Sequence, residues 1–296
     1  MKKRSLTIIL ILLIALMCTA CASFDFEEQG GYIITAKEAL ALDGATFVDA
    51  RGQEEYDKDH VEGAVCLPMS ALVVNEPYKN MAPDTQQINE VMSASGLTQD
   101  DTLLIYDDAS NMQAARIQWT LNLYSNTNVL VVSGGYNALV QAGANMTDAT
   151  TTIIPAVYET GDKKRKLVVS LNYIKALIDE PEENTVIVDT RSSEEFSAGT
   201  IPGSVHIEYV WNNYGSGKYK SPRDIRLTYL NKGLDPDTKI ILFCKTSIRA
   251  AESYTALKDA GFKDVRIYDG AWLEYEESEN PAPPAADTAP VQGDAS

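Results

Sequence analysis

Histidine and cysteine are scarce in this chain, whose 296 residues include two histidines and four cysteines. His60 and His206 stand far apart, and neither has the cysteine or carboxylate spacing around it that metal sites use, so we expect no metal and no cofactor. Cys66 and Cys244 are the only cysteines beyond the first 21 residues, which excludes a fold built on a framework of disulfides. An isolated cysteine in such a chain invites a chemical explanation, although a buried inert thiol is the commoner case.

Positive charge is also in short supply. Lysine and arginine number 25 against 42 aspartates and glutamates, which gives a formal net charge of −17. A surface of this sign repels phosphate backbones, which excludes nucleic acid as a partner, and it repels small anions unless a site supplies local positive charge. Hydrophobic residues make up 45% of the chain, enough for a packed core, and the length favours two domains.

The chain lacks an apolar segment long enough to cross a membrane comfortably. Three basic residues stand near its start, and the apolar run Leu6–Met17 that follows has the length of a signal-peptide core. Residues 1–21 therefore indicate a secretory signal, and its end at Cys21 resembles the cleavage site of bacterial lipoproteins. In that family the cysteine carries the lipid, so we expect an exported protein anchored on the extracytoplasmic side of a membrane. Ordinary cleavage after Ala20 or Ala22 would instead release a soluble protein.

Two further segments lack the apolar periodicity of packed elements. Residues 22–31 indicate a short tether between the anchor and the fold. Residues 276–296 are rich in proline, alanine and acidic side chains, a composition typical of a disordered tail.

Between these segments the chain repeats itself. The motif VDARGQEEY begins at Val48, and the motif VDTRSSEEF begins at Val188, 140 positions later. Tyr32–Thr35 and Leu167–Ser170 also correspond, and each ends in a residue that favours a helix N-cap. A repeat of this length indicates two copies of one domain. The expected parts are a first domain at residues 32–149, a linker at 150–166 and a second domain at 167–275.

Short apolar strands alternate with helical segments in each copy. In the second copy we expect strands at Thr185–Val188, Lys239–Phe243 and Val265–Tyr268, and a helix at Ile248–Ala260 that stops before Gly261. Strands that are apolar throughout predict an α/β fold in which each domain is a parallel sheet with helices on both faces. In sheets of this kind, functional sites form at the carboxyl ends of the strands.

Cys244 stands at such a strand end, directly before the expected helix. Free backbone N–H groups and the helix dipole stabilise a thiolate at this position. Lys245 and Arg249 add positive charge nearby, a setting that makes a cysteine nucleophilic. Position alone favours a structural cysteine at a strand end, and the flanking cations together with the repeat reverse this in favour of the reactive one.

Taken together, these motifs resemble the tandem-domain rhodaneses, the thiosulfate and mercaptopyruvate sulfurtransferase family. The residues that carry the resemblance are Asp189, Arg191, Glu195, Phe196, Gly199, Ile201–Val205, Cys244–Arg249, Gly270 and Trp272 in the second copy, and Asp49, Arg51, Glu55, Tyr56, His60, Gly63–Val65, Ala114–Arg116 and Trp119 in the first. The resemblance covers nearly everything from Tyr32 to Tyr275 and implies two rhodanese-like domains.

The resemblance also implies a mechanism. Cys244 would take the outer sulfur of a small anionic donor as a persulfide and pass it to cyanide or a thiol. Lys245 would hold a sulfonate oxygen, Arg249 would hold either the loop or the anion, and backbone N–H groups of the loop would form an anion nest. The residues assigned to the loop are Lys245, Thr246, Ser247, Ile248 and Arg249, and those assigned to its support are Asp189 and Arg191.

The first domain is expected to be inactive. Aligning the two equivalent strands puts Asp107 opposite Cys244, followed by a second carboxylate at Asp108. Such a pair cannot act as a sulfur nucleophile and would repel an anionic donor. If Arg116 is the counterpart of Arg249, the first loop is four residues longer than the second.

A basic stretch precedes the second loop. It contains Lys218, Lys220, Arg223 and Arg226. If this stretch folds over the mouth of the loop, it would draw anions toward the cysteine. The alternative is an ordinary solvated face.

The loop leaves the donor and the reaction class open. Lys245 is followed by neutral Thr246, whereas thiosulfate-preferring members carry two basic residues there and mercaptopyruvate-preferring members carry none, so charge favours thiosulfate over 3-mercaptopyruvate. Phosphatases of this fold place five residues between cysteine and arginine, and four lie between Cys244 and Arg249. A non-catalytic persulfide carrier or anion-binding surface lipoprotein remains the alternative to an enzyme.

Overall fold

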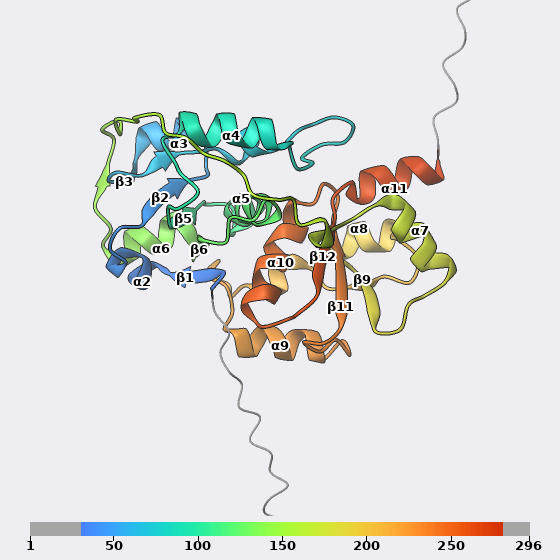
Figure 1. Ribbon diagram of the computed structural model, residues 1–296. Coiled ribbons are helices and arrows are strands. Elements are labelled where there is room, and N and C mark those ends of the chain that lie inside the picture. Colours follow the sequence, from blue (N-terminus) through green and yellow to red (C-terminus); the bar gives the residue numbers. More distant parts are fainter. Residues whose placement is uncertain (1–30, 281–296) are drawn as a thin grey trace, which may run out of the picture.

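Two similar α/β domains make up the part of the chain that the computed structural model describes, residues 31–280 (Figure 1). The strands and helices of the first domain are β1 (Ile33–Thr35), α2 (Ala36–Ala41), β2 (Thr46–Asp49), α3 (Gln53–Lys58), β3 (His60–Val61), β4 (Val65–Cys66), η1 (Met69–Leu72), α4 (Thr85–Ala94), β5 (Leu103–Tyr106), α5 (Met112–Leu123), β6 (Val129–Ser133), α6 (Gly135–Ala142) and β7 (Met146–Thr147). Those of the second domain are η2 (Arg165–Leu167), β8 (Val168–Val169), α7 (Leu171–Asp179), β9 (Thr185–Asp189), α8 (Ser193–Ala198), β10 (Val205–His206), η3 (Tyr209–Asn212), α9 (Pro222–Leu230), β11 (Lys239–Phe243), α10 (Ile248–Asp259), β12 (Val265–Tyr268) and α11 (Ala271–Glu279).

The two sheets have the same strand order, which confirms the repeat. The first runs β1-β6-β5-β2-β4 and the second β8-β12-β11-β9-β10, and every pairing within them is parallel. Thr35 and Ser170 act as N-caps of α2 and α7, because their hydroxyl groups accept the N–H of the residue three positions on.

The strands are buried on both faces, which explains their nearly continuous apolar sequences. In β11, Ile240 and Leu242 face a core shared with α10, while Ile241 and Phe243 face a second core under α7 and α11. In the first domain, β5 alternates in the same way between the core with α5 and a core under α2, α3 and α6. The predicted α/β architecture, with helices on both faces of each parallel sheet, is confirmed.

Helices α5 and α10 pack against each other where the domains meet (Figure 1). The largest apolar core crosses this junction and contains residues of both helices. Polar contacts are built into it as well: the Thr255 hydroxyl donates to Gln118 Oε1 at 2.7 Å, and Gln118 Nε2 donates to the carbonyls of Tyr32 and Val129. The junction thus brings the start of α10, and Cys244 before it, up against the first domain.

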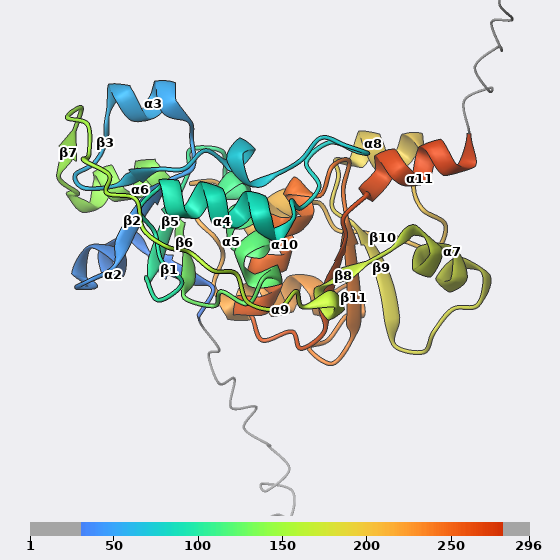
Figure 2. The same cartoon turned by 45° about the horizontal axis from the view of Figure 1, so that its top comes forward.

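The linker lies along the first domain and has a fixed course. Tyr158 is buried, and its hydroxyl accepts the side-chain amide of Asn126 at 3.0 Å. The N–H groups of Ala156 and Gly161 donate to the carbonyls of Ser93 and Tyr124. Figure 2 shows this segment passing from β7 across domain 1 to β8.

The predicted start of the disordered tail at residue 276 is wrong. Helix α11 continues to Glu279, so four of the residues assigned to the tail are helical. Trp272 and Tyr275 pack this helix on the core under α7, and Lys175 forms an ion pair with Glu279 at 3.1 Å. Residues 281–296, the signal 1–21 and nearly all of the tether 22–31 lie outside the described residues.

None of the helices within residues 31–280 has both the length and the apolar character that a membrane span requires.

Candidate active site

Cys244 directly follows β11, and only Lys245, Thr246 and Ser247 separate it from α10. Ser247 is the N-cap of α10 and has a left-handed backbone, with φ of 64°, which lets the chain turn sharply into the helix. Its buried hydroxyl donates to the carbonyls of Tyr268 and Asp269, at 3.0 and 2.9 Å. Because this side chain does not cap the helix, the first N–H groups of α10 stay available beside the cysteine.

The backbone around Cys244 is held by hydrogen bonds from residues that follow the two neighbouring strands, β9 and β12. The Cys244 carbonyl accepts the N–H of Trp272 at 2.9 Å, and the Phe243 carbonyl accepts both the N–H and the hydroxyl of Thr190. The Cys244 side chain is only 1% exposed. A donor in solution therefore has almost no access to the sulfur in this conformation.

Arg249 holds the loop through Glu195 of α8. The two side chains form a bidentate pair, with Nη1–Oε2 and Nη2–Oε1 distances of 2.5 and 3.0 Å. This hydrogen-bonded guanidinium lowers the pKa of Glu195 to about 2. Burial lowers the pKa of Arg249, but its contacts with Glu195 and with the nearby Cys244 outweigh burial and raise it. Of the two roles predicted for Arg249, the contact with Glu195 is consistent with the one of bracing the loop.

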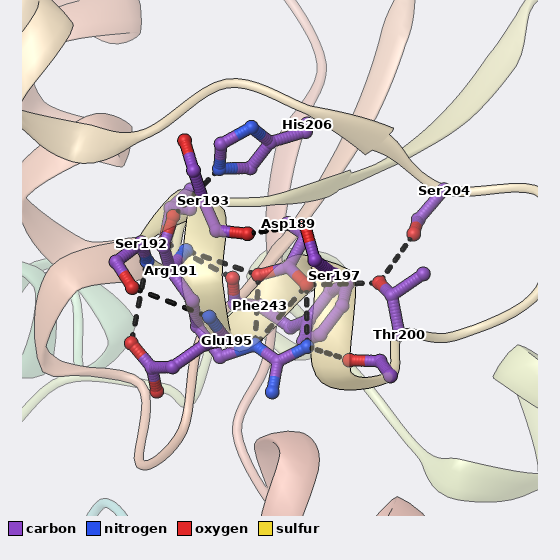
Figure 3. A network of polar contacts seen from close by, with 12 residues as sticks. Asp189, Arg191, Ser192, Ser193, Glu195, Ser197, Thr200, Ser204, His206 and Phe243 are labelled. Carbon is purple, nitrogen blue, oxygen red and sulfur yellow. Dashed lines mark hydrogen bonds and ion pairs between the residues drawn. The ribbon is translucent and has the colours of Figure 1, made fainter.

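Asp189 and Arg191 form the buried pair that the sequence assigns to loop support (Figure 3). Arg191 Nε and Nη2 donate to the Asp189 carboxylate, the latter at 2.6 Å, and Nη2 also donates to the Gly199 carbonyl. The Thr200 hydroxyl donates to the same carboxylate at 2.8 Å. Asp49 and Arg51 pair in the same way in the first domain. The pair recurs in the first domain, where Asp107 stands in the place of Cys244, so its formation does not depend on the loop cysteine.

Lys245 is exposed and lines a cavity of about 220 Å³ beside the loop. Arg191 and the Trp272 ring form part of the same wall, and Glu195 and Glu276 add negative charge. Cys244 itself is not among the lining residues. The cavity thus lies next to the buried Cys244 and is lined by side chains of both charges.

Asp107 occupies the place of Cys244 in the first domain, directly after β5. Its carboxylate accepts four backbone N–H groups, from Ala109, Asn111, Gln113 and Ala114, at 2.7–3.0 Å. Burial raises the pKa of Asp107, and these four donors oppose the rise. The loop's N–H groups therefore converge on the side chain that follows the strand.

The predicted match between Arg116 and Arg249 is wrong. Asn111 is the left-handed N-cap of α5, as Ser247 is of α10, so the first loop is one residue longer and not four. Gln113 then stands where Arg249 stands. The misalignment has a simple origin: each helix carries an Ala-Ala pair at equivalent positions, and the arginine follows the pair in α5 but precedes it in α10.

The loop before α4 brings the first domain to the second domain's active-site loop (Figures 1 and 2). Asn80 Nδ2 donates to the Thr246 hydroxyl at 3.1 Å, and the Ala82 N–H donates to Asp269 Oδ2 at 2.8 Å. Arg116 joins both partners, because Nη2 donates to the Asn80 carbonyl and Nη1 lies 2.9 Å from Asp269 Oδ1. Sequence reasoning missed these contacts, since no local pattern relates residues 166 positions apart.

The contact is reciprocal. Asn111 of the first domain's loop donates from Nδ2 to Asn213 Oδ1 and to the Gly217 carbonyl of the second domain. Each domain thus closes the other's loop with one of its own segments.

Two of the four residues of the basic stretch do not fold over the mouth of the Cys244 loop. Arg226 is buried and donates from Nη1 to the carbonyl of Ala260, at the end of α10 opposite to Cys244. The aliphatic part of Lys218 lies against Gly134 in the first domain. Both side chains are therefore used in packing away from the mouth of the Cys244 loop.

The remaining candidates are Cys66, whose thiol has a raised pKa, and the two histidines, which stack on aromatic rings. Cys66 is half-buried at the end of β4, where burial and then the negative charge of Asp49 raise its pKa to about 11. His60 is stacked on Tyr56, and His206 on Phe196. Within residues 31–280, histidine, cysteine and carboxylate side chains form no group of three that could hold a metal.

Known proteins share this architecture. A relative from Mycobacterium leprae, provisionally named a thiosulfate sulfurtransferase, is 28% identical over 79% of this chain and 90% of its own length. A relative from Schizosaccharomyces pombe, provisionally named a 3-mercaptopyruvate sulfurtransferase, is 27% identical over 81% of this chain and 87% of its own length.

Solved structures match the whole fold. The crystal structure of SseA from Escherichia coli, described as a 3-mercaptopyruvate sulfotransferase with the rhodanese fold, has a TM-score of 0.72 at 23% identity and covers 81% of this chain and 98% of its own. The anaerobic ergothioneine biosynthesis enzyme from Chlorobium limicola has a TM-score of 0.73 at 20% identity and covers 86% of this chain and 70% of its own. The family model for the rhodanese-like domain matches residues 35–142 and again residues 170–278. The chain therefore belongs to the rhodanese-like family and contains two domains of it.

Proposed function

We propose that this protein is a sulfurtransferase that carries sulfane sulfur on Cys244. Comparing the two loops supports this most strongly. In the first domain, four backbone N–H groups converge on the carboxyl side chain that follows the strand. The second domain has the same left-handed turn into its helix, uncapped, with a cysteine at that position. Such a cradle suits a thiolate and the persulfide that it forms.

The proposed reaction has two balanced steps. The Cys244 thiolate attacks the outer sulfur of the donor, and the donor's sulfur–sulfur bond breaks, so thiosulfate leaves as sulfite. A nucleophilic acceptor then attacks the outer sulfur of the persulfide, which returns the Cys244 thiolate. With cyanide the product is thiocyanate, and with a thiolate it is a new persulfide.

The loop residues divide the work between them. Backbone N–H groups at the start of α10 stabilise negative charge on sulfur, and Arg249, held by Glu195, keeps these groups in place beside Cys244. Lys245 in this cavity attracts the anionic end of the donor, which the negative charge of the rest of the surface would repel.

Thiosulfate is the donor that we favour. Lys245 supplies a cation to bind its sulfonate oxygens, and its neighbour Arg191 lines the same cavity. The names of the relatives include both thiosulfate and 3-mercaptopyruvate sulfurtransferases, so 3-mercaptopyruvate is the second donor to test.

The test is steady-state formation of thiocyanate from thiosulfate and cyanide, repeated with 3-mercaptopyruvate. Cys244→Ser should reduce turnover to the uncatalysed rate. Cys66→Ser is the matched control and should keep wild-type turnover, since this thiol is half-buried and has a raised pKa. Absence of turnover with both donors, or loss of it only in the Cys66 variant, would overturn the assignment.

A persulfide carrier is the second candidate, and the 1% exposure of Cys244 favours it, because a shielded persulfide survives longer. A carrier would accept one sulfur per chain and release it once, without multiple turnovers. The ratio of thiocyanate formed to protein present separates the two candidates.

We also propose export and lipid anchoring through Cys21, which lies outside the described residues. The basis is the signal-like sequence of residues 1–21. Incorporation of labelled palmitate into the wild type and not into Cys21→Ser would support it, and equal labelling of both would refute it.

A further inference from the structure

A second cavity, of about 400 Å³, lies where the two domains and the linker meet. The linker contributes Lys164 and Lys166 to its wall, the first domain contributes Asn122, and the second contributes Lys258 and Arg266. Lys258 stands in the last turn of α10, whereas Cys244 precedes the first turn. A helix of 12 residues is about 18 Å long, so this linker pocket is separate from the cysteine loop.

The linker pocket collects positive charge in a strongly acidic protein. Five basic side chains line it, against one carboxylate, Asp264. Arg266 is neutralised by Asp264 at 2.6 Å, and Lys263 by Asp237 at 2.5 Å. The nearby Asp259 carboxylate accepts N–H groups of Tyr32 and Ile33 and is not part of the wall.

Three lysines of the pocket have no carboxylate partner among residues 31–280. Lys258 donates to two backbone carbonyls, those of Phe262 and Lys263, and only the nearby Asp264 carboxylate, already paired with Arg266, offsets its charge. Lys164 and Lys166 make no side-chain ion pair or hydrogen bond within the described part of the chain. Burial lowers the pKa of Lys164 and of Lys258. The positive charge of Lys166 lowers both further, and the negative charge of Asp264 opposes the lowering at Lys258. A bound anion would relieve this repulsion.

Asn122 provides an independent observation. Its side chain is 4% exposed, lines the pocket, and has no hydrogen-bond partner within residues 31–280. Its amide oxygen and nitrogen are not fully enclosed and reach the open space of the pocket, so water or a ligand can supply their hydrogen-bond partners. An amide of this kind, turned into a basic cavity, is suited to donate to a ligand oxygen.

We propose that the linker pocket binds a small molecule bearing two or more phosphate- or sulfate-type oxyanion groups. Three lysines without an ion-pair partner among residues 31–280 match more than one negative charge, and 400 Å³ is the size of pockets that hold small organic ligands and far exceeds one tetrahedral oxyanion. Since both domains and the linker line the pocket, the ligand bridges them and stabilises their junction. The inference does not depend on sulfur transfer.

The test is calorimetric titration of the purified full-length chain with inorganic tripolyphosphate, with a trisulfated disaccharide as the sulfate-bearing probe and citrate as a carboxylate. We expect saturable binding of tripolyphosphate or the disaccharide, a higher Tm in their presence, and weaker binding of citrate. The tighter of the two probes identifies the phosphate or the sulfate class. Cys244→Ser should bind equally well, which separates this site from the proposed sulfur chemistry.

Two variants make the test specific. Lys164→Gln/Lys166→Gln should weaken binding about tenfold or more, whereas Lys58→Gln/Lys163→Gln, with the same change in net charge outside the pocket, should not. Asn122→Asp places a carboxylate among the lysines, so it should abolish binding and raise the Tm of the free protein. No saturable binding by the wild type, or equal weakening in both lysine pairs, would overturn the proposal.

Discussion

The buried ion pair between Arg116 and Asp269 couples the domains, and its removal should be costly. The Arg116 side chain is fully buried, that of Asp269 is 7% exposed, and Nη1 lies 2.9 Å from Oδ1. The guanidinium also lies over the Trp119 ring, 4.5 Å from its centroid, and donates to the Asn80 carbonyl. In Arg116→Met the packing volume is largely kept, but Asp269 remains buried with the Ala82 N–H as its main donor.

The size of the effect follows from this burial. Leaving one charge of a buried pair uncompensated costs about 3–5 kcal/mol, far more than the 0–1 kcal/mol typical of an exposed pair. We therefore expect Arg116→Met to lower the free energy of unfolding by about 3–5 kcal/mol. Arg116→Met/Asp269→Asn should be more stable than Arg116→Met alone, because the second change removes the unpaired charge while keeping an acceptor for Ala82.

Urea unfolding followed by circular dichroism measures these free energies, and the four proteins form a double-mutant cycle. Thiocyanate formation by each variant shows whether loosening Asn80 also disturbs the loop through Thr246. A loss below about 1 kcal/mol in Arg116→Met, or strict additivity in the double variant, would refute the reasoning.

Three further predictions concern titratable side chains. Burial raises the pKa of Glu252 to about 8, so the folded protein keeps a proton that the unfolded chain releases above about 4.5. Stability should therefore fall as pH rises from 5 to 8, and Glu252→Gln should flatten this slope in urea titrations. Cys66, with a pKa of about 11, should resist iodoacetamide at pH 7.5 and react as pH approaches 11, as peptide mapping would show. Glu195→Gln frees Arg249 and should lower sulfur transfer roughly 10- to 100-fold, whereas unchanged turnover would contradict its bracing role.

Local patterns were enough to predict the sheets. The strands Lys239–Phe243 and Val265–Tyr268 have the bounds expected from their apolar runs, and the helix from Ile248 ends one residue earlier than predicted, at Asp259. These elements are buried on both faces, so their sequences carry an unambiguous signal. Cys244 was found for the same reason, because it stands between two such elements.

What sequence reasoning missed depends on packing between distant segments. Glu279 belongs to an acidic stretch that indicates disorder by composition, yet Trp272 and Tyr275 anchor the helix that contains it. Taking Arg116 as the counterpart of Arg249 gives the wrong register, because the left-handed N-caps Asn111 and Ser247 set the correspondence of the two loops. Asn80 has no local feature that points to a loop 166 residues away.

Sulfur transfer through Cys244 is tested most directly by the mass of the intact protein after exposure to thiosulfate. We expect a gain of one sulfur atom, located on the peptide that contains Cys244, and its loss with release of thiocyanate when cyanide is added. Cys244→Ser should gain none. Sulfur on any other residue, or no gain with either thiosulfate or 3-mercaptopyruvate, would contradict a Cys244 persulfide.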